Sequence, residues 1–188
     1  GVEFLLEGKG IMKIGITGAQ SVGKTTLLNA LRSEKLFKDY VICDEVTRRV
    51  KSYGLPINEE GTDITQRLIM NEHIVNVFLY GNMLTDRTAL DGLVYSAYLF
   101  KNNRINASTL RYVKDVFNKV WHSYDYVFYI EPEFEIIDDG VRSTNKQFRD
   151  EIADLFEATI EKNELSMLRV KGSVRNRVNT IIDHLEGR

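Results

Sequence analysis

The chain has a single cysteine, almost no net charge and no long apolar run. These features argue against an internal disulfide, a general attraction to nucleic acid and a membrane span, respectively. Cys43 alone cannot form an internal disulfide, and it lacks the neighbouring ligands of a zinc site. A formal net charge of −2 gives no general attraction to nucleic acid, although it leaves a local basic patch open. No apolar run approaches the length of a membrane span, and no signal peptide is visible. We therefore expect a cytoplasmic protein with no membrane partner.

Length and composition predict one domain with a full core. The chain has 188 residues, 43% hydrophobic and 28% charged, which is ordinary for a globular protein. There is no repeat, low-complexity segment or long linker. We expect residues 12–188 to form a single domain, and residues 1–11 to be a cloning remnant or an upstream extension.

The stretch GITGAQSVGKTTLLNAL, residues 15–31, matches the phosphate-binding pattern G-x-x-x-x-G-K-[ST]. Its two glycines permit backbone angles at which successive N–H groups point at one anion. The lysine supplies a positive charge for the β- and γ-phosphates, and the threonine offers its hydroxyl to Mg²⁺. The following helix adds its positive N-terminal end. The ATP-binding residues predicted in this loop are Gly18, Ala19, Gln20, Ser21, Val22, Gly23, Lys24, Thr25 and Thr26.

The surroundings of this motif favour a true phosphate loop over a chance glycine turn. Residues 11–17 have the composition of a strand, and residues 25–33 have leucines at helical spacing. Strand, glycine-rich loop and helix thus occur in the required order.

The rest of the chain alternates strands and helices. This pattern predicts an α/β fold, with a five-stranded, mostly parallel sheet covered by helices on both faces. Further strands are expected at 38–45, 82–88, 125–132 and 165–172. Further helices are expected at 64–81, 89–100, 108–120, 148–163 and 174–187, with 46–54 helical or irregular and 134–147 mobile. Thr62 or Asp63 is expected to cap the helix 64–81, whose apolar face would comprise Ile64, Leu68, Ile69, Ile74, Val75, Phe78 and Leu79.

Ligands of a parallel sheet bind beyond the carboxyl ends of its strands, so the residues that follow each strand are the candidates. A carboxylate there can orient a hydroxyl and take its proton, or hold Mg²⁺, and an arginine can offset the charge of transfer. For each residue the alternative is a solvated charge or a structural ion pair. The candidates are Asp44, Glu45 and Arg48 after the second strand, Asp86 and Arg87 after the third, and Asp138, Asp139, Arg142 and Arg149 after the fourth.

His73, Tyr95 and Gln66 are weaker candidates. His73 has no ligand-spaced partner, which favours a core or substrate-lining residue over a metal ligand. Tyr95 could stack on a base or sugar, although core packing is favoured. Gln66 follows the expected helix cap and is a candidate for substrate binding.

Four segments carry a resemblance to a known family, and they occur in the family's order across most of residues 12–180. They are GITGAQSVGKTTL, DEVTRR, LTDRTALDGLVY and DDGVRSTNKQFRDEI. With them the chain resembles the nucleoside- and nucleotide-kinase branch of P-loop proteins. More closely, it resembles small AAA-type kinase domains related to ribosylnicotinamide kinase, and the Asp86-Arg87 pair is closer to deoxynucleoside and thymidylate kinases. Ribosylnicotinamide kinases have an Asp-Thr-Asp type pattern where this chain has Thr85-Asp86-Arg87, so the acceptor stays open.

The resemblance implies ATP- and Mg²⁺-dependent transfer of phosphate to a small nucleoside or nucleotide. It implies a lid at about 133–146, from which Arg142 would reach the ATP phosphates, and Ser173 near adenine. The implied catalytic residues are Lys24, Glu45, Asp86, Arg87 and Arg142. The implied metal ligands are Thr25 and Asp86, and the implied acceptor-binding residues are Asp44, Glu45, Arg48, Gln66, Arg87 and Tyr95.

Three alternatives compete with a nucleoside or nucleotide kinase. One is a kinase for a hydroxyl on a base within DNA, which the near-neutral charge disfavours. Another is a ribosylnicotinamide kinase. The third is a nucleotide-dependent switch, but the guanine-reading pattern Asn-Lys-x-Asp fails because Phe148 follows Asn145-Lys146-Gln147. The oligomeric state is left open, with a homodimer as one alternative.

Overall fold

The structure is a computed structural model that describes residues 10–20, 22–44, 46–132 and 143–187. Its centre is one sheet with the strand order β2-β3-β1-β4-β5, in which every neighbouring pair is parallel. The strands are β1 (Lys13–Thr17), β2 (Val41–Cys43), β3 (Met83–Asp86), β4 (Tyr126–Ile130) and β5 (Leu168–Val170). The predicted α/β fold with a parallel five-stranded sheet is confirmed.

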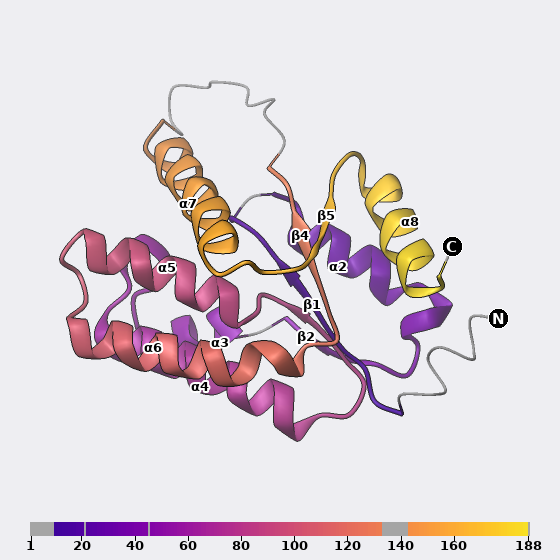
Figure 1. The fold of residues 1–188 in the computed structure, drawn as a ribbon, viewed down its shortest axis with the longest axis horizontal. Helices are drawn as coiled ribbons and strands as arrows, with labels where there is room; N and C mark the ends of the chain where they lie inside the picture. Colours follow the sequence, from indigo (N-terminus) through magenta and orange to yellow (C-terminus); the bar gives the residue numbers. More distant parts are fainter. Residues whose placement is uncertain (1–9, 21, 45, 133–142, 188) are drawn as a thin grey trace.

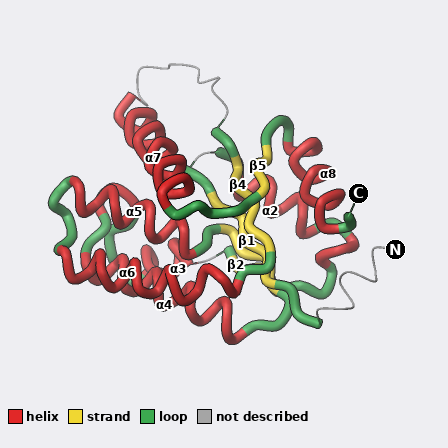
Figure 2. The backbone as a smooth tube through the Cα atoms, in the orientation of Figure 1, coloured by secondary structure: helices red, strands yellow, loops and turns green. Residues whose placement is uncertain are grey.

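Helices cover both faces of this sheet, as a buried parallel sheet requires. On one side lie α2 (Lys24–Arg32) and the closing helix α8 (Val174–Leu185), which pack against each other (Figures 1 and 2). On the other side lie α4 (Asp63–Leu79), α5 (Ala89–Lys101), α6 (Ala107–Val120) and α7 (Ser143–Lys162), with the short α3 (Val46–Ser52) beside α4. The single-turn helices are η1 (Lys35–Phe37), η2 (Asn58–Glu60) and η3 (Trp121–Ser123).

The strand order brings three strand ends together. β1 is the central strand and pairs with β3 on one side and with β4 on the other. In a parallel sheet of this kind, the connections that follow neighbouring strands lead to opposite sides and leave a crevice at the carboxyl ends of the strands. The register pairs Ile16 with Asp86 and Cys43 with Thr85. The loop after β1 and the residues that follow β2 and β3 therefore lie at the same edge.

The predicted strands are longer than the observed ones. β2 and β5 have three residues each, whereas the sequence predicts strands over 38–45 and 165–172. Both are edge strands, so each is limited to the length over which its single neighbour pairs with it.

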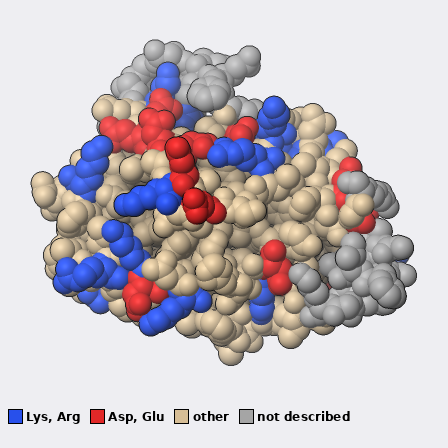
Figure 3. Space-filling view, viewed as in Figure 1, with Lys and Arg blue, Asp and Glu red and all other residues tan. Residues whose placement is uncertain are grey.

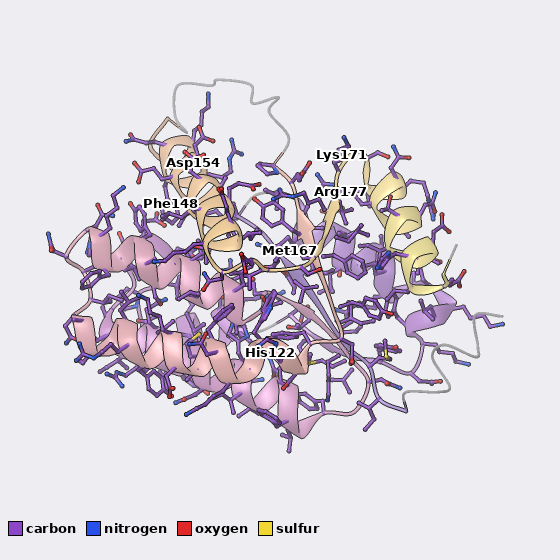
Figure 4. All side chains as sticks on the ribbon, viewed as in Figure 1. His122, Phe148, Asp154, Met167, Lys171 and Arg177 are labelled. Carbon is purple, nitrogen blue, oxygen red and sulfur yellow. The ribbon has the colours of Figure 1, made fainter. Side chains whose placement is uncertain are left out.

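The start of α7 corrects the predicted mobile segment, because residues 143–147 are helical. Phe148 follows them on the side of α7 that faces α5 (Figure 4). Its buried ring packs edge-on against Tyr95 and Tyr98, with centroid distances of 5.9 and 4.9 Å. Helices gain most of their stability from such packing, which explains the helical start. The rest of the predicted lid, residues 133–142, lies outside the described residues.

The prediction for α4 is wrong about which face is buried. None of the seven residues of its expected apolar face is fully buried, and Phe78 and Leu79 are 66% and 70% exposed. The cap at Thr62 is as expected, since its hydroxyl accepts a hydrogen bond from the amide of Thr65 at 3.3 Å. The buried residues of α4 are Thr65, Gln66, Met70, His73, Asn76 and Val77.

Hydrogen bonds to other parts of the chain explain why α4 buries Thr65 and Gln66. Gln66 Nε2 donates to the hydroxyl of Ser96 in α5 at 2.8 Å, and the Thr65 hydroxyl donates to the Pro56 carbonyl at 2.8 Å. A buried polar group is tolerated when its hydrogen bonds are made inside the protein. These partners lie 30 and 9 residues away along the chain, beyond the reach of a hydrophobic pattern.

The face of the molecule shown in Figure 3 has no continuous stripe of basic side chains. On the face shown in Figure 3, acidic and basic side chains intermingle with uncharged surface between them. A nucleic-acid backbone is usually bound by a stripe of one sign, which this face lacks. Across the described residues, no helix combines the length and apolarity needed to cross a bilayer.

Buried His73 predicts a specific pH dependence of stability. It is 1% exposed, it lies against Gly92 of α5, and neither ring nitrogen has a hydrogen-bond partner among the described residues. Burial lowers the pKa of His73 to about 4, outweighing the opposite effect of Asp91. Between this pKa and the ordinary 6.5 the unfolded chain binds the extra proton, so the free energy of unfolding should fall as the pH falls. From pH 7 to pH 5 the loss should be about 2 kcal/mol.

His73→Leu removes the titrating group, so urea unfolding at pH 7 and pH 5 should show that this part of the loss has disappeared. The control is His122→Leu, since His122 is exposed and should keep the wild-type dependence. The same loss in His73→Leu and wild type would contradict the assignment.

Candidate active site

The phosphate loop joins β1 to α2, and two of its glycines hold angles that other residues rarely adopt. Gly18 has a φ of 149°, and a Cβ there would lie 2.9 Å from the carbonyl oxygen of Ile130. Gly23 has a φ of 87° in the left-handed region and is the N-cap of α2. Both positions therefore require glycine. The loop leads into the start of α2, where the first N–H groups of the helix and its dipole favour an anion.

Lys24 is the first residue of α2, and its side chain is buried over the loop. Nζ donates to the carbonyl oxygens of Gly18 and Ala19 and lies 3.8 Å from a carboxylate oxygen of Asp91. Burial lowers the pKa of Lys24, and Asp91 acts in the opposite direction. The arrangement places a cation among the amides that would face a triphosphate.

Asp91 is a site residue that does not stand out in the sequence. It is buried, and its Oδ2 accepts hydrogen bonds from the Thr17 hydroxyl at 2.6 Å and from the Thr88 amide at 2.8 Å. Its Oδ1 is 3.4 Å from the Gly18 amide. Thr88 and Asp91 form the capping box of α5, and this threonine–acid spacing is the local signal that could have found it.

Asp86 is the last residue of β3, and it lies at the same edge of the sheet as the phosphate loop. Its Oδ1 is buried, with no hydrogen-bond partner among the described residues. Burial raises the pKa of Asp86, while Lys24 and Arg87 lower it. A buried carboxylate oxygen that lacks a donor is suited to a cation or to the proton of a substrate hydroxyl.

Arg87 is held in a strained conformation next to Asp86. Its φ of 78° is uncommon for a residue with a side chain. Its amide donates to the Ile16 carbonyl at 2.9 Å, and its own carbonyl accepts from the Thr85 hydroxyl at 2.9 Å. Its guanidinium lies 5.6 Å from the ring centre of Tyr95. Strain that neighbours maintain in this way is typical of functional positions.

Thr25 and Asp86 line one cavity, and their oxygens are of the kind that Mg²⁺ prefers. In the part of the chain that the structure describes, no group of three or more His, Cys, Asp or Glu could hold a metal ion by itself. Mg²⁺ usually keeps several waters and binds through one or two protein oxygens together with phosphate oxygens. The two residues therefore fit a Mg²⁺ that arrives with a phosphate.

Arg177, in the first turn of α8, forms a hydrogen bond to the main chain of the phosphate loop. Its side chain points from α8 towards the strands (Figure 4). Nη1 donates to the Val22 carbonyl at 2.5 Å, and Nη2 lies 3.5 Å from the Glu131 carbonyl that follows β4. A Cβ on Gly23 would lie 3.4 Å from Nη1. This buried arginine therefore ties the loop to α8 and to the end of β4, and no sequence motif marks it.

A cavity of about 480 Å³ unites most of the predicted site. It extends from the phosphate loop past the end of β3 to α3. The predicted residues that line it are Gln20, Gly23, Lys24, Thr25, Thr26, Asp44, Arg48, Asp86 and Arg87.

The other predicted residues are not part of this lining or lie outside the described residues. The hydroxyl of Tyr95 accepts from the Gln20 amide at 3.1 Å, and burial raises its pKa to about 12. Gln66 is bound to Ser96, as described above, and Ser173 caps α8 by accepting from the Asn176 amide at 3.2 Å. Gly18, Ala19 and Val22 are buried within the loop. Ser21, Glu45 and Arg142 lie outside the described residues.

A family model described as an AAA domain matches residues 13–177, most of the chain. The chain belongs to the AAA domain family. No curated protein matches it in sequence.

Solved structures share the fold of this AAA domain. A NadR protein in complex with NR has a TM-score of 0.71 and 16% identity, over 97% of this chain and 54% of that chain. A second NadR structure, with NAD and AMP-PNP, has a TM-score of 0.69 and 14% identity, over 97% of this chain and 51% of that one. Deoxyadenosine kinase from M. mycoides, with dCMP and dCDP, has a TM-score of 0.65 and 17% identity, over 94% and 99% of the two chains. The AAA domain spans about half the length of the NadR chains and has the fold of a P-loop nucleoside-kinase-type domain.

Asp91→Ala should be strongly destabilising, because it leaves Thr17 and Thr88 without their buried acceptor and Lys24 without its buried counter-charge. We expect the free energy of unfolding to fall by about 3 kcal/mol or more in urea denaturation. The control is Asp115→Ala, whose exposed pair with Lys119 on α6 should contribute less than about 1 kcal/mol. Equal losses in the two variants would contradict the role of Asp91.

Arg177→Leu should loosen the phosphate loop, because the Val22 carbonyl loses its donor. Hydrogen exchange at the amides of residues 18–25 should become faster than in wild type. Arg175→Leu is the control, since Arg175 lies on the same helix and forms an exposed 3.5 Å pair with Glu34. Unchanged exchange of the loop in Arg177→Leu would contradict this role of Arg177.

Proposed function

We propose that this AAA domain is a small-molecule kinase that transfers the γ-phosphate of ATP to a nucleoside or nucleoside monophosphate in nucleotide metabolism. The observation that carries the proposal is the single cavity in which the phosphate loop, Lys24 and Thr25 face Asp86 and Arg87. Phosphoryl transfer needs mainly positioning and the neutralisation of charge, and these groups can supply both.

The proposed reaction is an in-line displacement at the γ-phosphorus. An acceptor oxygen forms a bond to that phosphorus, the bond to the oxygen bridging to the β-phosphorus breaks, and ADP leaves with the electron pair. Lys24 and the loop amides neutralise the triphosphate, and Arg87 offsets the charge that develops. Thr25 and Asp86 would hold Mg²⁺, which supplies further positive charge to the phosphates. We also assign Arg142 to the ATP phosphates and Ser173 to the adenine side.

A hydroxyl acceptor must also lose its proton, and two carboxylates are candidates to take it. Asp86 lines the cavity and is one candidate, in the alternative in which it does not hold Mg²⁺. Glu45 is the other candidate because it follows Asp44, which also lines the cavity. A phosphate acceptor is already anionic and needs no base.

The bound ligands of proteins with this fold support the assignment. The NadR structures hold NR in one case and NAD with AMP-PNP in the other, and the deoxyadenosine kinase holds dCMP and dCDP. A ribosylnicotinamide kinase and a kinase for a base hydroxyl in DNA keep the same chemistry and differ in the acceptor. A guanine-type switch is disfavoured because residues 145–147 lie inside α7 rather than after a strand.

Lys24→Ala should lower ATP-dependent phosphate transfer by about a hundredfold or more, since the triphosphate loses its buried cation. The measurements are ADP release with a panel of nucleosides and monophosphates, and calorimetric binding of MgATP. We expect a cooperative melt to persist in this variant. Lys38→Ala, at an exposed position away from the cavity, should retain wild-type transfer and binding. Wild-type rates in folded Lys24→Ala, or the absence of MgATP binding by folded wild type, would overturn the proposal.

A further inference from the structure

The orientation of α3 is fixed by two buried valines, one of which also borders the cavity, and by an ion pair with α4. Val46 and Val50, one turn apart, are buried in the core. Arg49 donates to Glu72 of α4 at 2.9 Å. Because a helix has about 3.6 residues per turn, these anchors determine where the remaining side chains point. Figure 1 shows α3 beside α4, in agreement with these contacts.

α3 also presents one hydroxyl and two cations to the cavity, namely Thr47, Arg48 and Lys51. We call these three residues the α3 donor face. The oxygen of Thr47 is buried, without a hydrogen-bond partner among the described residues. Arg48 is 3.4 Å from Asp44, which also binds Arg32 at 3.1 Å. A guanidinium has five donors, so this pair orients Arg48 and leaves donors for a ligand.

The charged lining of the cavity is mainly positive. Among the described residues it comprises four cations, Lys24, Arg48, Lys51 and Arg87, and two acids, Asp44 and Asp86. Two of these cations lie at the phosphate loop and at the end of β3, and the other two belong to the α3 donor face. The cations are therefore divided between two sides of one cavity.

The described lining contains no Phe, Tyr or Trp, and its apolar side chains are Val46 and Ile57. A nucleobase is usually held by a flat aromatic or broad apolar surface. The α3 side of the cavity is therefore better suited to recognise charge than a base.

We propose that the α3 donor face binds a phosphate group of the acceptor, so that the substrate is a nucleoside monophosphate rather than a free nucleoside. This inference rests on the proposed kinase function and names its acceptor class. A phosphate monoester carries nearly two negative charges and several acceptor oxygens, which match two cations and a hydroxyl. The bond changes are those given above, whichever acceptor oxygen attacks. A cationic riboside is disfavoured by the same charges.

Binding of matched pairs tests the inference on the full chain. Each common deoxynucleoside and its 5′-monophosphate would be titrated calorimetrically, with a cationic pyridinium riboside and a short single-stranded oligonucleotide as further probes. At least one monophosphate should bind about tenfold or more tightly than its nucleoside. Arg48→Gln combined with Lys51→Gln should reduce that ratio to near one. An oligonucleotide that binds as tightly as the monophosphate would support the phosphate site and identify nucleic acid as its source.

Several results would overturn the inference. They are equal or weaker binding of every monophosphate relative to its nucleoside, binding of neither class, and a preference that survives in the double variant. The control combines Arg111→Gln with Lys114→Gln, which removes the same charge from exposed positions on α6 and should keep the preference. Melting curves would establish that both double variants are folded.

Separate titration with MgATP distinguishes this inference from the proposed function. Absence of MgATP binding would overturn the kinase assignment, whichever acceptor binds. Normal MgATP binding without a preference for monophosphates would overturn only the assignment of the α3 donor face.

Discussion

The buried carboxylate of Asp91 is the interaction on which the phosphate loop depends. It accepts hydrogen bonds from Thr17 at the end of β1 and from Thr88 at the start of α5, and it lies beside the Gly18 amide and the Lys24 ammonium. One side chain thus links a strand, the loop and two helices. Because the Thr17 hydroxyl and the Thr88 amide would otherwise be buried without this acceptor, the network favours a single arrangement of the loop.

The strand ends of the site could be predicted from the sequence, because an apolar strand followed by polar residues is a local pattern. That rule identified Asp44, Asp86 and Arg87, and all three line the cavity. Asp91 and Arg177 could not be found in this way. They act on main-chain groups 73 and 155 residues distant, at Gly18 and Val22, and only the fold brings those groups together.

Helix α4 also shows that a local sequence pattern does not reveal contacts between distant residues. Here the pattern predicted the wrong buried face. Its apolar residues recur at helical spacing, which normally marks the buried face. The face that is buried carries Gln66, whose amide is satisfied by Ser96 of α5. Hydrophobic periodicity reflects the free-energy cost of exposing the apolar face of a helix to water. It contains no information about hydrogen bonds to distant residues, which lower the free-energy cost of burying the polar face. The sheet was predictable because its strands are short, mainly apolar runs, and the apolar pattern by itself indicates that they are buried.

Two of the four cations in the described lining of the cavity, Lys24 and Arg48, are paired with acids. Lys24 has Asp91 behind the loop, and Arg48 has Asp44, which also binds Arg32. An anion that enters can therefore contact Arg48 without breaking its pair with Asp44, whereas Lys24 must exchange one of its present partners for the anion. Since Asp44 already orients the guanidinium of Arg48, this side chain would need little reorganisation to meet a phosphate. The cavity thus combines a positive lining with an arginine that is already oriented, and this combination suits transfer between two anionic partners.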